Sequence, residues 1–105
     1  MIFIETPIFT KLVKDLLPDD EYKQLQEALL LRPDAGNIIP SSGGLYKVRW
    51  RIPGKGKRGG IRIIYYWHKS EDRLYMLTAY KKSKQEDLTQ SQLAILRKVV
   101  EEWLK

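Results

Sequence analysis

The chain has 105 residues, no cysteine and a formal net charge of +6. This length fits a single domain spanning residues 1–105 with its own buried core, and the lack of cysteine excludes a disulfide scaffold, a zinc knuckle and a thiol nucleophile. No apolar run approaches the roughly 20 residues of a membrane-spanning helix. The N-terminus also lacks the basic region of a signal peptide. We therefore expect a cytoplasmic protein that does not act at a membrane.

Positive charge is concentrated in the middle of the chain. Residues 44–84 hold 12 of the 19 lysines and arginines and only two acids, Glu71 and Asp72, so this segment carries +10 and the rest carries −4. Such asymmetry indicates a surface for a polyanion, the alternative being a solvated basic face.

The first part of the chain predicts a strand followed by two helices. Ile2 to Glu5 predicts a short strand, and Thr6-Pro7 is typical of a helix start because proline suits the first helical position. The apolar residues that recur at helical spacing in the first helix are Ile8, Leu12 and Leu16. Those of the second helix are Tyr22, Leu25 and Leu29. That helix should end near Arg32-Pro33, and residues 36–44 are expected to form a loop.

Three strands and a last helix follow. Residues 45–51 alternate between apolar and basic side chains, residues 61–68 are rich in β-branched and aromatic residues, and residues 73–80 complete a meander. Thr89 and Gln92 form a capping-box pattern at the start of the last helix. Its apolar face comprises Leu93, Leu96, Val100 and Trp103. The order β-α-α-β-β-β-α predicts an α+β fold with helices packed on a small, mostly antiparallel sheet.

The predicted meander brings cations together. Lys47, Arg49 and Arg51 share one face of a strand, and Arg62 joins them from the next strand. Further basic residues in the glycine-rich turn and after the third strand are Lys55, Lys57, Arg58, Lys81, Lys82 and Lys84. Converging cations suit phosphate binding, the alternative being an exposed face that resists edge aggregation. The tyrosines that could offer faces to unstacked RNA bases are Tyr66, Tyr75 and Tyr80.

Other catalytic arrangements lack support in the sequence. His68 is the only histidine, Glu71-Asp72 is typical of a turn rather than a metal site, and GKGKRGG lacks P-loop spacing, so we expect neither a metal nor a cofactor. Lysine and arginine chemistry remains. RNA is cut when its 2′-hydroxyl attacks the adjacent phosphate, and the enzyme must align the groups and stabilise phosphate charge. A lysine crowded by other cations has a lowered pKa and can accept a proton.

Two segments resemble a known family. GGLYKVRW and GKGKRGGIRIIYYWHKSEDRLYMLTAYKKSKQEDLT, together with the element order, resemble HigB-type toxins of the RelE/ParE superfamily over nearly the whole chain. The resemblance implies a ribosome-dependent endoribonuclease that cuts mRNA in the A site of the small ribosomal subunit. It also implies a type II toxin–antitoxin module whose cognate antitoxin is a helix-turn-helix protein of the HigA type.

The resemblance also implies roles for individual residues. The catalytic candidates are Lys47, Arg49, Lys57, Arg62 and Lys82. The charge pattern and the tyrosines of the predicted sheet, together with the resemblance, give these RNA-binding candidates: Arg51, Lys55, Arg58, Tyr66, Tyr80, Lys81 and Lys84. Where RelE-type enzymes carry an arginine and then a tyrosine after the last strand, this chain has Ser83 and Thr89; Lys82 or Lys84 is the substitute for the arginine and Tyr80 is the nearest tyrosine.

Two alternatives remain open. ParE-type members share the fold but act on DNA gyrase, a role that the density of cations on the strand disfavours. The other alternative is a non-catalytic module that binds RNA or the ribosome.

Overall fold

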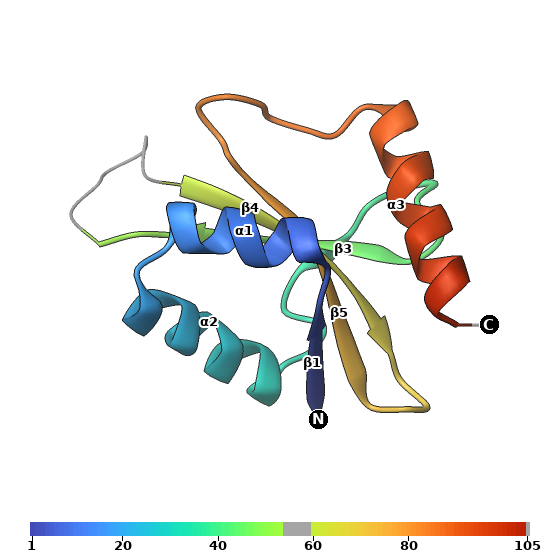
Figure 1. Cartoon of the computed structure of the whole chain (residues 1–105), viewed down its shortest axis with the longest axis horizontal. Coiled ribbons are helices and arrows are strands. Elements are labelled where there is room, and N and C mark those ends of the chain that lie inside the picture. Colours follow the sequence, from blue (N-terminus) through green and yellow to red (C-terminus); the bar gives the residue numbers. More distant parts are fainter. Residues whose placement is uncertain (54–59, 105) are drawn as a thin grey trace.

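The computed structural model describes residues 1–53 and 60–104 (Figure 1). One five-stranded sheet has the order β1-β5-β4-β3-β2, in which β1 pairs with β5 in parallel and the other pairs are antiparallel. The elements are β1 (Ile2–Glu5), α1 (Pro7–Leu16), α2 (Asp19–Leu31), β2 (Asn37–Ile38), β3 (Leu45–Arg51), β4 (Gly60–His68), β5 (Arg73–Lys81) and α3 (Gln90–Trp103). The predicted α+β fold is confirmed, with one correction: the expected loop contains the short strand β2, which pairs with β3.

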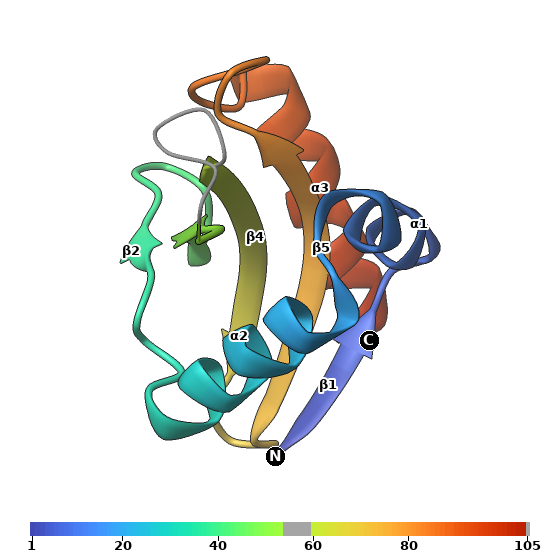
Figure 2. The same ribbon diagram turned by 90° about the vertical axis from the view of Figure 1, so that its left-hand side faces the viewer.

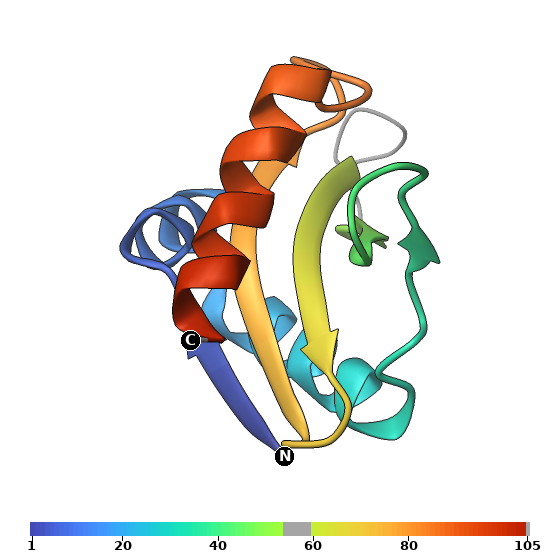
Figure 3. The same cartoon turned by 90° about the vertical axis from the view of Figure 1, so that its right-hand side faces the viewer.

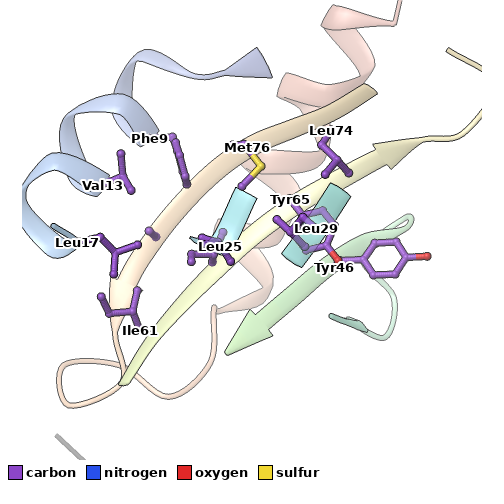
Figure 4. Packing of buried hydrophobic residues seen from close by; sticks show 12 residues of the cluster. Phe9, Val13, Leu17, Leu25, Leu29, Tyr46, Ile61, Tyr65, Leu74 and Met76 are labelled. Carbon is purple, nitrogen blue, oxygen red and sulfur yellow. The ribbon is translucent and has the colours of Figure 1, made fainter. Parts of the chain in front are cut away.

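The helices cover both faces of the sheet. Helices α1 and α2 lie over one face and α3 lies over the other (Figures 2 and 3). Beneath α1 and α2, Ile61, Ile63 and Tyr65 of β4 pack in the core that Figure 4 shows. On the α3 side, Ile64 packs with Leu93 and Val100. The side chains of β4 therefore alternate between the two cores.

The start of α1 is fixed to the sheet. The Thr6 hydroxyl accepts a hydrogen bond from the Phe9 amide (2.9 Å) and donates one to the Leu77 carbonyl of β5 (2.8 Å). This anchor sets the rotation of the helix so that Phe9 and Val13 are buried, whereas Ile8 is 58% exposed. The predicted stripe was thus wrong by one residue, because helical periodicity alone does not fix which of two adjacent apolar rows faces the core.

An irregularity interrupts the pairing of β4 with β5. Tyr65 lies opposite Met76 and Ile64 lies opposite Thr78, so Leu77 is an extra residue on β5. An extra residue reverses the alternation of the strand beyond it. As a result Tyr75 and Tyr80 lie on the same face of the sheet although five positions separate them.

Candidate functional site

Four side chains form a group on the α3 side of the sheet, here named the cationic face: Lys47, Arg49, Arg62 and Tyr80. Arg49 of β3 lies directly opposite Arg62 of β4, which in turn lies opposite Tyr80 of β5. Lys47 is two residues before Arg49, so it points to the same side. The prediction that Lys47, Arg49 and Arg62 share one face is confirmed.

Arg62 is held in an unfavourable position. Arg62 is only 6% exposed, and its Nε donates a long hydrogen bond (3.4 Å) to the Glu86 carbonyl. Among the described residues it has no carboxylate within salt-bridge distance. A buried charge without a partner destabilises a fold, and like charges directly opposite each other on a sheet do the same. Arg49 and Arg62 are therefore suited to receiving an anion from outside.

Lys47 has a carboxylate partner. Its Nζ lies 2.7 Å from the Asp87 Oδ1, in the segment between β5 and α3. The lysine side chain is 16% exposed and that of Asp87 is 73% exposed. The hydrogen bond and charge of Lys47 lower the pKa of Asp87 below its ordinary value, so this acid is a carboxylate at neutral pH.

Tyr80 lies between these charges. Its hydroxyl donates to the Glu86 carbonyl (3.3 Å). Burial raises the pKa of Tyr80, against a lowering effect of Arg62 and Arg49. The phenol is therefore protonated at neutral pH and can act as a hydrogen-bond or proton donor, not as a base.

Two clefts meet at Arg49. The first has a volume of about 430 Å³ and is bounded by β2, the cationic face and the start of α3. Its walls include Asn37, Lys47, Tyr80, Asp87, Leu88 and Gln90. The second, of about 400 Å³, lies between the ends of β3 and β4 and includes Arg51, Arg62 and Lys82. Neighbouring clefts with a shared cation suit successive nucleotides of a single strand, whose phosphate would lie at Arg49.

The structure brings some of the other predicted residues to this site. Arg51, at the end of β3, and Lys82, just after β5, line the second cleft. Lys84 lies in the exposed turn beyond it. The predicted residues Lys55, Lys57 and Arg58 lie outside the described residues.

Three other predicted residues lie elsewhere. Lys81 is opposite Ile61, whose side chain packs under α1 and α2, so Lys81 starts on the other face. Tyr66 lies at the far end of β4, opposite Leu45, and packs beside Tyr75. Tyr75 is only 3% exposed, so the expectation that it offers a face to a base was wrong: α3 covers it, and its ring contacts Trp103.

Sequence reasoning missed Asp87, Asn37 and Gln90. The one available signal was an acid just before a helix N-cap and after a lysine-rich turn. Among the residues that the structure describes, no group of three or more histidine or acidic side chains is placed to hold a metal ion. In the same part of the chain, no helix has the length and apolar character needed to cross a membrane.

The fold and site define an α+β protein with a cationic surface on its sheet. Residues 5–105 match the family model described as the RelE toxin of the RelE/RelB toxin–antitoxin system. The chain belongs to this family. Among solved structures, it is similar to an arginine-to-alanine double mutant of the E. coli toxin RelE in the free state, with 16% identity, a TM-score of 0.58, and coverage of 90% of this chain and 94% of the other.

A second similar structure is the intact E. coli RelBE toxin–antitoxin complex. The match has 15% identity and a TM-score of 0.55, and it covers 76% of this chain and 94% of the matched chain. At these identities the two structures support the fold and the RelE-like topology.

Proposed function

We propose that this toxin is a metal-independent endoribonuclease that cuts mRNA on the ribosome, as HigB-type members of the superfamily do. The observation that carries the proposal is the pair of opposed arginines, Arg49 and Arg62. Arg62 is buried and has no carboxylate partner in the described part of the chain, and both arginines border clefts on one sheet face. A fold that keeps such a pair loses stability unless an anion binds there. A phosphodiester is the anion that the family's activity supplies.

The chemistry follows from the cationic face. The 2′-hydroxyl of one nucleotide gives its proton to solvent water and attacks the adjacent phosphorus. The bond from phosphorus to the 5′-oxygen breaks, and a cyclic phosphate and a 5′-hydroxyl result. Arg49 and Arg62 stabilise the charge that develops on the phosphate oxygens. Tyr80, which lies opposite Arg62 and whose hydroxyl is protonated, would donate a proton to the departing 5′-oxygen.

The ribosome would supply alignment. The described part of the site offers cations and a phenol but no carboxylate free of a cation partner that could take the proton from the 2′-hydroxyl. In-line alignment of the reacting groups contributes about 7–11 kcal/mol in favourable cases. A ribosome that holds the message in the required geometry would provide this contribution, and the basic face would dock on ribosomal RNA.

The family also implies a cognate antitoxin, for which we propose a helix-turn-helix protein. An apolar groove of about 540 Å³ between α1 and α3 includes Ile8 and Ile95, which are 58% and 63% exposed. Exposed apolar patches mark interaction sites. This groove is the surface that we expect the antitoxin to cover.

The test compares one transcript, naked and in a stalled translation complex, at equal toxin concentration. We expect efficient cleavage on the ribosome, poor cleavage of the naked RNA, and a steep loss of association with added salt. Arg49→Ala should reduce cleavage, whereas Lys23→Ala, which removes an exposed cation from α2, should not.

Each other outcome points to a different protein. Equal rates on both substrates would reject ribosome dependence. Ribosome binding without cleavage would indicate a non-catalytic module, and induction of DNA damage in expressing cells would indicate a gyrase inhibitor. Restored growth on co-expression of a helix-turn-helix protein encoded next to the toxin gene would support the antitoxin assignment.

A further inference from the structure

One short segment of the chain contacts most of the cationic face. Residues 85–88 belong to the loop that joins β5 to α3 (Figure 1, orange). The Asp87 carboxylate lies 2.7 Å from the Lys47 ammonium. The preceding carbonyl, of Glu86, accepts hydrogen bonds from Arg62 and Tyr80. Three of the four members of the cationic face are thus engaged by two consecutive residues.

This segment is held in place by α3. The side-chain amide of Gln85 donates to the Asp87 carbonyl (2.8 Å) and to the Gln92 side-chain oxygen (2.7 Å). Gln92 in turn closes the capping box with Thr89 at the start of α3. The position of Asp87 is therefore set by the same contacts that begin the helix, and its contact with Lys47 is part of the fold.

The pair of Lys47 and Asp87 is suited to exchange. A lysine ammonium makes the same kind of charge-assisted hydrogen bond with a carboxylate oxygen and with a phosphate oxygen. Because Asp87 is 73% exposed, solvent screens the pair and weakens its attraction. Arg49 and Arg62 also lower the pKa of Asp87 through their charges, so its carboxylate acts on all three cations.

We propose that Asp87 is an internal competitor for RNA phosphate: in the free toxin its carboxylate occupies Lys47, and a phosphate of the substrate displaces it. This inference rests on the proposed function, because it assigns RNA to the cationic face. Its consequence is that the free toxin binds arbitrary single-stranded RNA more weakly than its cations would allow. Additional contacts, such as those that a ribosome offers, are then needed to complete the site.

The test uses two neutral substitutions at neighbouring positions. Asp87→Asn keeps the shape of the side chain and removes the charge that faces Lys47. Glu86→Gln removes the same charge one residue earlier, where only the backbone carbonyl contacts the cationic face. The probe is a 2′-O-methyl RNA oligonucleotide, which cannot be cut, with binding followed by fluorescence anisotropy over a range of salt concentrations.

We expect Asp87→Asn to tighten binding about 3–5-fold more than Glu86→Gln, because an exposed ion pair is weak and its loss changes affinity only modestly. Most of the gain should be lost in the background of Lys47→Met, which makes this a double-mutant cycle, and the remainder reflects Arg49 and Arg62. Equal gains from both substitutions would show a general charge effect and would overturn the proposal, as would weaker binding by Asp87→Asn.

The binding assay does not depend on cleavage. The competitor is therefore supported or rejected by the comparison of the two variants, whereas the proposed enzymatic function is decided separately by the fate of ribosome-bound message.

Discussion

Replacement of Arg62 by methionine should separate stability from activity. Methionine has similar length and fills the space that an alanine would leave empty. The substitution removes the like-charge contact with Arg49, a destabilising contact worth about 0.2–1 kcal/mol. It also removes a buried charge that has no carboxylate partner in the described structure, which is a second gain in stability. It also removes the hydrogen bond to the Glu86 carbonyl, which at 3.4 Å lies at the weak end of charge-assisted bonds, about 1.5 kcal/mol.

These opposing effects nearly cancel, so the free energy of unfolding should change by no more than about 1 kcal/mol, a shift of at most about 4–8 °C in Tm. Activity should respond very differently. Loss of one donor to developing phosphate charge reduces the rate about 10²–10³-fold, or about 2.7–4 kcal/mol. Arg62→Ala should lose activity to the same extent.

The assay is mapping of mRNA 5′ ends after induction, together with thermal unfolding of the purified variant. Lys23→Met on the exposed surface of α2 is the matched control and should retain full toxicity. A folded Arg62→Met variant that cuts mRNA at the normal rate would refute the assignment of Arg62. If the free energy of unfolding of Arg62→Met falls by several kcal/mol, the view that the arginine is retained at a cost to stability is refuted.

Two further predictions concern the segment between α2 and β2. Gly36→Ala should lower the free energy of unfolding by about 1–3 kcal/mol, because a Cβ at this position would lie 2.8 Å from the Lys47 carbonyl oxygen. Urea denaturation measures the change. An unchanged midpoint would show that this backbone can move. Burial raises the pKa of Tyr65 from 10.0 to about 12, so the folded state favours the phenol: stability is fully present below pH 10 and is lost as the pH rises through about 12. Tyr65→Phe removes the hydrogen bond to the Pro33 carbonyl and should lower the free energy of unfolding by about 1–3 kcal/mol at neutral pH. It should also make the loss of stability at alkaline pH shallower. An identical dependence of stability on alkaline pH would contradict the assignment to Tyr65.

The sequence determined the features that depend on neighbouring residues. Thr6-Pro7 and the Thr89–Gln92 capping box marked helix starts, because a cap is a contact within one turn. Alternation in β3 and β4 placed the basic residues opposite the core-facing ones, because the two-residue period is a property of any extended strand. The resemblance to RelE-type toxins then identified the family.

Only the tertiary structure decided which of these residues meet. The extra residue Leu77 shifts the register of β5 by one position, so Tyr80 and not Ala79 lies opposite Arg62. No local pattern encodes that irregularity, because it arises from pairing with β4. The position of Asp87 against Lys47, 40 residues away in the chain, was equally hidden. A loop residue acquires its partner only when the strands and helix on either side of it have packed, and that packing depends on contacts between distant parts of the sequence.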